Sequence, residues 1–347
     1  MQSRSRNREQ CSCARTPLAP TLREQCSLPP THAPEAPVHV LLTGAGQIGQ
    51  ALVPHLLAHG DTVTVLRAYG PDLPGTTTVR GDAGDRALLA RLTASTPPDA
   101  VVHTVHAAYD HRVWRAELPP REQAVMDLAT GLGIPVVFPE SVYAWGNAAR
   151  DLTEGAPVAP TTPLGQVRAE LLAARAAHPA RTLSIVAADL IGPTATTSGS
   201  VATALVVRPA AAGRRVWFPG DPDAPHALTH LPDLARALRH AAAHAEHLAP
   251  GGDAVIHAPT PPSRSMAALA DAAATATGAG RARVTRLPTW PLAVAGLADA
   301  TMRELHRMRY LWTQPSHLRP GTLTTEEGLA ASAWEDVVAG GGDARSG

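Results

Sequence analysis

The stretch VHVLLTGAGQIGQALVPHLL at residues 38–57 decides the fold of this chain. Its first six residues form a largely apolar run, which is typical of a strand buried on both faces. Past the glycines, the apolar residues recur with helical spacing, at Ile48, Leu52, Val53 and Leu56. The stretch therefore predicts a strand, a tight turn and a helix in succession.

Between the strand and the helix lies the pattern G-x-G-x-x-G, formed by Gly44, Gly46 and Gly49, with Gln47 and Ile48 inside it. Gly44 permits the tight turn, Gly46 lets the backbone approach a pyrophosphate, and Gly49 lets the helix pack close to the strand. The N-terminus of the helix then faces the phosphates. In this setting the pattern predicts a dinucleotide-binding site; the alternative is a fold that has kept the turn but lost the ligand.

Downstream, apolar runs that read as strands alternate with helical patterns. We expect further strands at 62–66, 77–80, 100–106, 134–138 and 182–188, and helices at 85–92 and 121–132 among others. Such alternation predicts an α/β protein with a doubly wound parallel sheet.

The same patterns suggest how the chain is divided. We expect a disordered N-terminal extension at 1–37, a nucleotide-binding domain at 38–190, a mixed region at 191–335 and a disordered tail at 336–347. The mixed region has a returning strand at 254–258, and its helical patterns at 264–278 and 291–310 suggest a smaller C-terminal lobe that covers the strand ends. The extension has no apolar core of a signal peptide, and no stretch is long enough to cross a membrane, so we expect a cytoplasmic protein.

All 30 residues counted as Lys+Arg are arginine, so the chain has no lysine, and they balance 30 Asp+Glu. The missing lysine excludes Schiff-base chemistry and P-loop phosphate binding. Arginine is no free substitute, because its pKa is too high for it to give up a proton. The zero net charge argues against a nucleic-acid binder, which usually carries a basic surplus.

Two groups of residues raise the question of a metal. Cys11 and Cys13 lie in the N-terminal extension, where two thiols make a weak case for a site. His240, His244 and His247 share a helical face, but a solvated polar face is the better interpretation of that spacing. We therefore predict no metal.

The second expected strand indicates which dinucleotide is bound. An NAD site calls for Asp or Glu about 20 residues past the glycines, but this strand ends at Arg67. Arg67 suits the 2′-phosphate of NADP, which favours NADP over NAD, although a surface arginine is the alternative. Asp82, after the third strand, is placed to accept a hydrogen bond from the adenine amino group.

The chain resembles the extended short-chain dehydrogenase/reductase superfamily, in its NAD-dependent epimerase/dehydratase branch. The resemblance covers most of residues 38–335 and rests on six segments: TGAGQIG (43–49), GD (81–82), VVHTVHAA (101–108), VVFPESVYAWG (136–146), DLIGP (189–193) and HLPDLARAL (230–238). It implies a Rossmann domain, a C-terminal lobe that holds the substrate, and a homodimer.

The resemblance also implies a catalytic Ser or Thr after the fifth strand and a Tyr-x-x-x-Lys on the next helix. Ser141 aligns with the first of these. Leu164 stands where the Tyr belongs and Arg168 where the Lys belongs, so the family's usual acid is missing. Arg168 can still bind ribose hydroxyls; the alternative is a surface arginine paired with Glu170.

The family's dehydratases carry Asp-Glu directly after the Ser/Thr, and this chain has Val142-Tyr143, so that dehydration is not expected. Tyr143 then occupies a position that faces substrate in relatives and is a candidate acid, with core packing as the alternative. His106 or His103, near the end of the fourth strand, is a further candidate acid or base. The catalytic candidates are therefore Ser141, Tyr143 and His106.

These observations favour an atypical NAD(P)-dependent oxidoreductase or epimerase-like enzyme acting on a small organic substrate, such as a sugar or a secondary metabolite. A sensor or scaffold that binds the cofactor without redox turnover is the first alternative, because nucleotide binding needs neither Tyr nor Lys. A non-redox lyase or isomerase on the same fold is the second, because a fold does not fix a function.

Overall fold

The computed structural model describes residues 36–341, which lie almost entirely in one compact unit that begins at residue 37. All but the last two residues of the expected N-terminal extension, including Cys11 and Cys13, lie outside the described residues. The predicted domain boundaries remain a prediction.

A seven-stranded sheet forms the centre of this unit, with the strand order β11-β6-β5-β4-β1-β2-β3. Every pairing in it is parallel. The strands are β1 (His39–Thr43), β2 (Thr62–Arg67), β3 (Thr77–Arg80), β4 (Ala100–His103), β5 (Val136–Ser141), β6 (Thr182–Ala187) and β11 (Asp253–His257). The chain runs outward from β1 in both directions, so the predicted doubly wound parallel sheet is confirmed.

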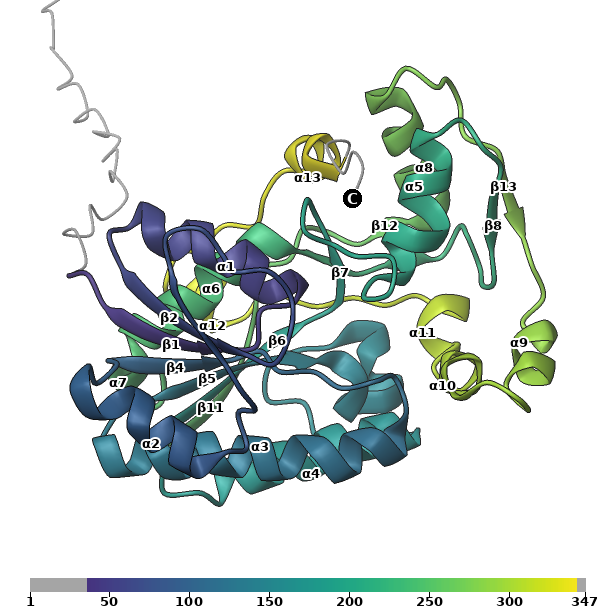
Figure 1. The fold of residues 1–347 in the computed structure, drawn as a ribbon. Coiled ribbons are helices and arrows are strands. Elements are labelled where there is room, and N and C mark those ends of the chain that lie inside the picture. Colours follow the sequence, from purple (N-terminus) through teal and green to yellow (C-terminus); the bar gives the residue numbers. More distant parts are fainter. Residues whose placement is uncertain (1–35, 342–347) are drawn as a thin grey trace, which may run out of the picture. The chain divides into compact units, whose positions relative to one another are not determined.

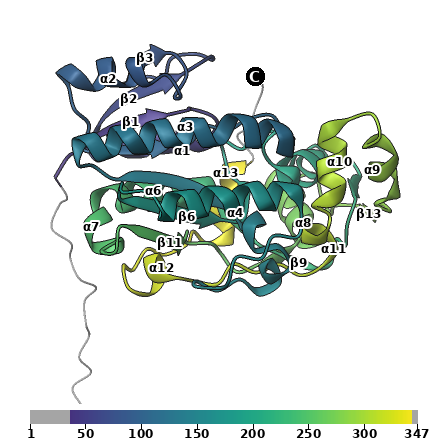
Figure 2. The ribbon, with the colours of Figure 1, turned by 90° about the horizontal axis from the view of Figure 1, so that it is seen from below.

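Helices cover both faces of the sheet (Figure 1). One face carries α1 (Gln47–Ala58) and α6 (Leu231–Ala243), which pack on each other. The other carries α2 (Arg86–Ser95), α3 (His111–Leu132) and α4 (Pro163–Ala176). Figure 2 shows α3 and α4 running side by side along that face.

Burial on both faces explains why the first strand is apolar throughout. Val40 and Leu42 of β1 belong to the core beneath α1 and α6, whereas Leu41 belongs to the core on the opposite face. Successive side chains of a strand point to opposite faces, so a strand with helices on both sides needs apolar residues at consecutive positions.

The C-terminal half supplies a lobe with its own apolar core, which is continuous with residues of α3 and α4. Its elements are β7 (Asp189–Ile191), η2 (Thr203–Val207), α5 (Arg208–Ala211), β8 (Val216–Phe218), β9 (Pro225–His226), β10 (Leu228–His230), β12 (Arg264–Ser265), α8 (Met266–Ala276), β13 (Val284–Arg286), α9 (Trp290–Ala295), α10 (Ala300–Arg307), α11 (Tyr310–Thr313) and α13 (Trp334–Gly341). Two further short helices, α7 (Ala245–Leu248) and α12 (Thr322–Thr325), pack against the central sheet instead. The short strands form three pairs, β10 with β7, β12 with β9, and β13 with β8.

The third helix is longer than its sequence pattern indicates. The pattern places it at 121–132, after two prolines that break helical hydrogen bonding, but α3 begins at His111 and runs through Pro119 and Pro120. Asp110 caps it, accepting a hydrogen bond from the backbone nitrogen of Arg112 at 2.7 Å. Buried Trp114 and other apolar residues hold the first turns against the lobe's core.

The end of the described chain also differs from expectation. Residues 336–341 were expected in a disordered tail, but they belong to α13, which packs on α8. Trp334 and Val337 of this helix are buried in the lobe's core. An apolar face that has a partner is sufficient reason for a short helix to form here.

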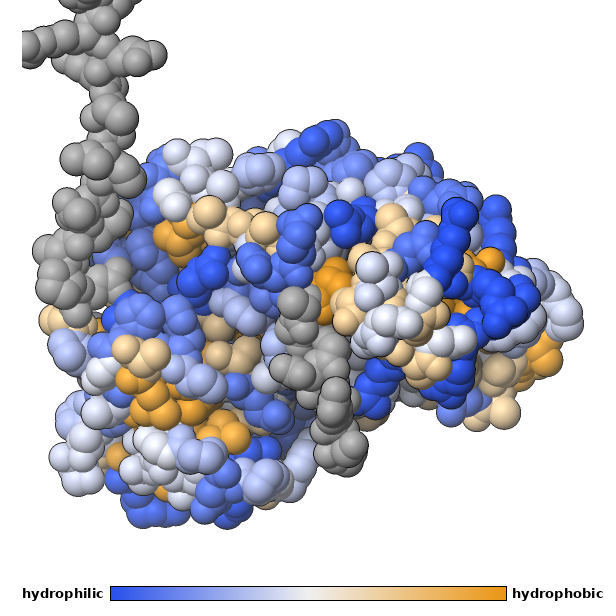
Figure 3. All heavy atoms as spheres, turned by 90° about the horizontal axis from the view of Figure 1, so that it is seen from above, coloured by the Kyte–Doolittle hydropathy of each residue, from blue (hydrophilic) through white to orange (hydrophobic). Residues whose placement is uncertain are grey.

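No described helix is long and apolar enough to cross a membrane. On the face drawn in Figure 3, hydrophobic residues form separate small patches among hydrophilic ones. The largest exposed apolar side chains include Tyr69 after β2 and Leu297 after α9.

Candidate active site

The glycine turn lies where the strand order reverses, between β1 and β4. Gly44 has φ +84°, and a Cβ added there would lie 2.8 Å from the backbone nitrogen of Val105, so this position requires glycine. Above Gly46, in contrast, an added Cβ would meet nothing within 4 Å. This open approach is what a pyrophosphate needs.

The first turn of α1 is also prepared for an anion. No side chain caps its N-terminus, so its first backbone N–H groups are available. An added Cβ at Gly49 would lie 3.1 Å from the backbone oxygen of Gly44. The absence of a side chain at Gly49 therefore lets the helix lie close to the strand. Ile48 is half-buried and packs on the core beneath α1. The residues present therefore fit a dinucleotide phosphate.

Gln47, predicted to bind the cofactor, holds a neighbouring loop. Its Oε1 accepts from the backbone nitrogen of Thr196 at 3.1 Å, and its Nε2 donates to the backbone oxygen of Gly199 at 3.0 Å. Its backbone oxygen accepts from Thr194 Oγ1 at 2.8 Å. The segment 194–199, which follows β7, is thus fastened beside the glycine turn.

Arg67 ends β2, as predicted, and its guanidinium holds the loop that follows. Its Nε donates to the backbone oxygen of Tyr69 at 2.7 Å, and its Nη1 donates to that of Pro71 at 2.6 Å. Asp82 accepts hydrogen bonds from Arg121 of α3, with Nη2 to Oδ2 at 2.8 Å. This ion pair lowers the pKa of Asp82. Arg67 is the last residue of β2 and Asp82 follows β3, so both lie at the carboxyl ends of neighbouring parallel strands, as the sequence indicates. Both side chains bind other groups of the protein.

Ser141 is the last residue of β5 and is half-buried. Its backbone nitrogen donates to Glu140 Oε1 at 2.7 Å, and its hydroxyl lies 3.4 Å from the same oxygen. The other carboxylate oxygen of Glu140 accepts from Arg175 Nη1 at 2.8 Å within the core. A fixed carboxylate thus orients the end of β5 where Ser141 lies.

Tyr143 lies just past β5 in the helical segment η1 (Val142–Asp151). Its hydroxyl accepts a hydrogen bond from the hydroxyl of Tyr109 at 3.2 Å. Its ring stacks on Trp114 of α3, with 6.4 Å between ring centroids and 4° between planes. Burial, followed by the nearby Asp189 carboxylate, raises the pKa of Tyr143 above its ordinary value. At neutral pH it is a protonated phenol that can donate a hydrogen bond.

Leu164 and Arg168 both lie on α4, four residues apart. Leu164 is fully buried in the core. The guanidinium carbon of Arg168 lies 4.7 Å from the centroid of Trp114, and its Nε lies 3.6 Å from Glu140 Oε1. Glu170, the partner considered for Arg168, pairs instead with Arg115 at 2.7 Å. Trp114 thus contacts both Arg168 and Tyr143, and Glu140 lies close to both Arg168 and Ser141.

The two histidines near β4 differ in surroundings. His103 ends β4 and is buried, with Nδ1 2.7 Å from Thr43 Oγ1. Burial lowers the pKa of His103 to about 3, so it is neutral at physiological pH. His106 lies in the loop beyond, is exposed, and packs against Trp114 with 4.9 Å between ring centroids. Of the two, only His106 is accessible to a ligand.

Sequence reasoning gave no role to a pair that lies near these residues. Asp189 Oδ2 and His226 Nε2 are 2.7 Å apart, and both residues line a small cavity next to η1. Asp189 belongs to the DLIGP segment that supports the family resemblance, but the segment by itself indicates no histidine partner for the carboxylate. His226 lies in β9, and no local sequence pattern connects it with Asp189.

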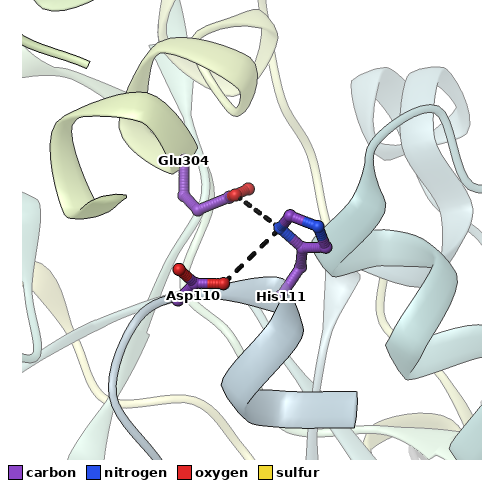
Figure 4. Close-up of side chains that lie close together, drawn as sticks. All are labelled: Asp110, His111 and Glu304. Atoms are coloured by element: carbon purple, nitrogen blue, oxygen red, sulfur yellow. Dashed lines mark hydrogen bonds and ion pairs between the residues drawn. The ribbon is translucent and has the colours of Figure 1, made fainter. Parts of the chain in front are cut away.

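One group has the composition of a metal site. Asp110, His111 and Glu304 bring ligand atoms within 4.8 Å of one another (Figure 4). His111 Nδ1 lies 2.8 Å from Glu304 Oε1, but Arg307 Nη1 lies 2.8 Å from the same oxygen. A guanidinium therefore already supplies the positive charge. We interpret the group as an ion-pair cluster between α3 and α10.

The histidines of α6 and α7 have a carboxylate partner. His240 Nε2 and His247 Nε2 lie 2.9 Å and 3.0 Å from the two carboxylate oxygens of Glu327. His240 also stacks on His244. These contacts support the interpretation of a polar face, with Glu327 as its centre.

The parallel sheet and the glycine turn between β1 and α1 are those of a nucleotide-binding fold of the Rossmann class. The model of the NAD dependent epimerase/dehydratase family matches residues 40–256, more than half of the chain, and the chain belongs to this family. No curated protein matches the sequence.

Solved structures share the fold at low sequence identity. The enzyme WbmH of Bordetella bronchiseptica, in complex with NAD+, is 18% identical with a TM-score of 0.67, covering 88% of this chain and 97% of its own. The UDP-glucose 4-epimerase of Thermotoga maritima, with UDP-glucose, is 16% identical with a TM-score of 0.67 and the same coverage. WbmG of Bordetella bronchiseptica, in complex with NAD and UDP, is 19% identical with a TM-score of 0.65, covering 88% and 94%.

Proposed function

We propose that this protein is an NAD(P)-dependent oxidoreductase or epimerase-like enzyme that transfers hydride to or from a small organic substrate, such as a sugar or a secondary metabolite. The observation that carries the proposal is the glycine turn, which leaves the space above Gly46 open at an uncapped helix N-terminus. Ser141 ends β5 at the carboxyl edge of the same parallel sheet, where ligands of such sheets bind. The bound nicotinamide would supply the hydride chemistry.

In this proposal the chain's own residues move and orient the proton. Ser141 orients the reacting oxygen, and Tyr143 donates the proton that the family's missing Tyr would provide. Tyr109 lies within hydrogen-bond distance of Tyr143 and supports it. Arg168 binds ribose hydroxyls with its guanidinium. His106, exposed beside Trp114, is the alternative acid or base.

For the dinucleotide we propose NADP in preference to NAD. Support comes from the cation at the end of β2, where an NAD site calls for a carboxylate. The loop carbonyls of Tyr69 and Pro71 fix the Arg67 guanidinium but use only two of its five N–H donors. Several structural neighbours were solved with NAD, so a direct comparison of affinities decides this point.

A second candidate function is a cofactor-binding sensor or scaffold without redox turnover. It is favoured by one observation: Leu164 is fully buried at the family's Tyr position, so the helix offers no proton donor there. A non-redox lyase or isomerase would need the same replacement acid. Substrate-dependent oxidation of the reduced dinucleotide distinguishes the proposed oxidoreductase from both alternatives.

The test is a thermal-shift titration with NADP, NADPH, NAD and NADH, followed by turnover of the reduced forms with a panel of carbonyl compounds. Ligand well above its dissociation constant should stabilise the fold by a few kcal/mol, about 3 at a hundredfold excess. No shift with any of the four refutes cofactor binding. A shift without turnover supports the sensor. Turnover that is unchanged in Tyr143→Phe and Ser141→Ala refutes the residue roles.

The proposal includes a homodimer, which the family resemblance implies, and a cytoplasmic location. The family supports the location, and none of the described helices can cross a membrane. Sedimentation at several concentrations tests the dimer: a single species of monomer mass across the range refutes it.

A further inference from the structure

The outer end of the lobe, formed by the paired strands β8 and β13 and the short helix α9, carries an exposed apolar surface. Figures 1 and 2 show α9 and β13 on the side of the lobe that faces away from the central sheet. Residues 287–298 include no ionisable side chain, and no residue of α9 is buried. The side chains of Trp290, Val294 and Leu297 are 65%, 57% and 84% exposed. This helix therefore presents apolar groups to the surroundings instead of to the core.

The exposed tryptophans of the chain are both at this end. Trp290 belongs to α9, and Trp217 is the middle residue of β8. Because successive side chains of a strand point to opposite faces, the buried Val216 and Phe218 leave Trp217 facing outward. A tryptophan ring has an apolar body and a polar N–H, and such rings are enriched where a membrane meets water. The other four tryptophans are at most 9% exposed: Trp114, Trp145, Trp312 and Trp334.

Positive charge flanks this apolar surface. Residues 213–218 and 281–286 contain five arginines, all exposed, and no acidic residue, although the chain as a whole has equal numbers of cations and anions. Arg215 Nη1 donates to Thr285 Oγ1 at 2.8 Å, and its guanidinium carbon lies 5.7 Å from the centroid of Trp217. Arginine and tryptophan thus share the outward face of the β8–β13 pair.

Two carboxylates approach these arginines without neutralising the group. Asp271 Oδ2 lies 4.0 Å from Arg281 Nε, and Asp221 Oδ2 lies 3.8 Å from Arg286 Nη1. Both contacts are long and exposed to solvent, so they contribute little. Five cations against two anions leave a net positive charge beside the apolar side chains. On the right of Figure 3, this end of the lobe shows hydrophobic residues next to hydrophilic ones.

We propose that the outer end of the lobe binds the surface of an anionic lipid membrane. Trp290, Val294 and Leu297 enter the boundary between headgroups and acyl chains, and the arginines bind the lipid phosphates. Apolar burial and attraction to anionic headgroups both stabilise such binding. A nucleic acid would satisfy the arginines but would offer no apolar environment for Leu297, so lipid fits the whole surface better.

Binding of this kind is peripheral and needs no membrane-spanning helix, in agreement with the described helices. It is also independent of the proposed function, because none of these residues is assigned to the dinucleotide or to proton transfer. Vesicle binding can therefore be measured without dinucleotide, and failure to bind NADP or NAD would refute the proposed function alone.

The experiment is co-sedimentation of the full chain with two sets of vesicles. One set contains equal parts of phosphatidylglycerol and phosphatidylcholine, and the other contains phosphatidylcholine alone. The proposal expects binding to the anionic vesicles at least about tenfold tighter, a difference of about 1.4 kcal/mol. The ratio should fall between about 0.1 M and about 1 M salt, where the Debye length shortens from about 10 Å to about 3 Å. No binding to the anionic vesicles, or equal binding to both sets, overturns the proposal.

Serine substitutions test the apolar contact. Val294→Ser and Leu297→Ser should each weaken binding to the anionic vesicles by at least about fourfold, the effect of losing one buried methylene group from the acyl boundary. Val158→Ser is the matched control, because Val158 is an exposed valine outside this end of the lobe. It should leave the affinity as in the wild type, and losses as large as those of Val294→Ser would overturn the assignment of the surface.

A charge reversal tests the arginines. Arg283→Glu should weaken binding to the anionic vesicles by at least about tenfold, because an attractive charge near the headgroups becomes a repulsive one. Arg91→Glu makes the same change in net charge at an exposed position of α2 and should have a much smaller effect. Equal losses in the two variants would mean that only overall charge matters, which contradicts the proposal.

Sedimentation velocity without vesicles tests the other occupant of such a surface, a second copy of the chain. The proposal expects the same oligomeric state in the wild type and in Leu297→Ser. Association that Leu297→Ser abolishes would assign the surface to contacts between copies and would overturn binding to lipid.

Discussion

Arg168 combines a feature of the composition, the absence of lysine, with a specific contact in the structure. The chain has no lysine, and the resemblance to the family suggests that Arg168 stands at the family's lysine position. A guanidinium there keeps the positive charge but cannot give up a proton. The planar guanidinium packs over Trp114, an arrangement that suits arginine better than lysine. Arg168 can therefore hold a ribose or a substrate oxygen, and the proton must come from another group.

At the residue scale, Tyr143→Phe tests that other group. Loss of a general acid costs about 10²–10⁴ in rate. Tyr143→Phe should therefore lower kcat by at least about a hundredfold, measured as oxidation of the reduced dinucleotide with an accepted substrate. Tyr109→Phe, which removes only the hydrogen-bond partner, should have a smaller effect. Equal losses in the two variants would contradict the assignment of Tyr143 as the donor.

The pH profile of the same reaction is a separate prediction. The folded-state pKa of Tyr143 is raised above the ordinary value of 10.0, so its phenol stays protonated up to and beyond pH 10. A proton donor with this property gives no loss of kcat from its own ionisation at lower pH. Steady-state rates from pH 6 to 10 check this; an alkaline limb with an apparent pKa below 10 that disappears in Tyr143→Phe is the contrary result.

His103 makes a prediction about stability. Its pKa is lowered from 6.5 to about 3 by burial, so the unfolded chain binds its proton more readily than the folded chain. Its contribution to stability is present above pH 6.5 and is lost as the pH falls toward 3. Between pH 6.5 and 4 the wild type should therefore lose about 3 kcal/mol of unfolding free energy through this group.

His103→Leu removes that titration. The fall in unfolding free energy between pH 6.5 and 4, measured by urea denaturation, should be smaller in the variant by about 3 kcal/mol. The same pH dependence in wild type and His103→Leu would show that His103 is accessible to protons in the folded state.

At the scale of elements, the segment 194–199 is held beside the nucleotide turn by Gln47. Gln47→Ala removes two side-chain hydrogen bonds, to Thr196 and Gly199, each worth about 1 kcal/mol. We expect the dinucleotide to dissociate roughly tenfold faster, because the loop beside the phosphates is released. Stopped-flow displacement measures the rate, and hydrogen exchange of a peptide covering 194–199 should rise even without cofactor.

Gln50→Ala is the matched control for that experiment. Gln50 lies on the same helix and is exposed. It should leave both the dissociation rate and the exchange of 194–199 unchanged. Unaltered exchange in Gln47→Ala would mean that the loop keeps its place without Gln47, and the argument would fail.

At the scale of the whole described molecule, one ion-pair cluster joins the nucleotide-binding half to the lobe. Glu304 of α10 is 1% exposed and accepts from both His111 of α3 and Arg307. Glu304→Leu leaves these partners without their acceptor and should lower the free energy of unfolding by about 2–4 kcal/mol. Denaturant titration at pH 7 measures it. Glu335→Leu, at an exposed position of α13, should change stability much less, and similar losses would contradict a linking role.

The glycine turn and the sheet could be predicted because they follow from short-range rules. Gly44 needs a positive φ, and β1 needs apolar residues on both faces, and each requirement is visible in a few adjacent residues. The start of α3 could not be predicted, because Pro119 and Pro120 argue locally for a break. Packing of the first turns against the lobe outweighs that local cost, and the lobe lies far away in sequence.

The candidate site divides in the same way. Ser141, Tyr143 and Arg168 could be listed from spacing and resemblance, but their neighbours could not. Trp114 of α3 contacts both Tyr143 of η1 and Arg168 of α4. Asp189 and His226 are 37 residues apart, and neither has a pattern that points to the other. Chain separation of this size leaves no local trace in the sequence.

By itself, then, the sequence determined the parallel α/β sheet and the glycine turn between β1 and α1, and it made Tyr143 and Arg168 candidates for the site. Each is a statement about residues a few positions apart, where backbone geometry and periodicity act. Only the tertiary structure decided which groups surround these candidates: the Tyr109 hydroxyl beside Tyr143, the Trp114 ring beside Arg168, and the cavity that contains Asp189 and His226. These contacts depend on how distant elements pack.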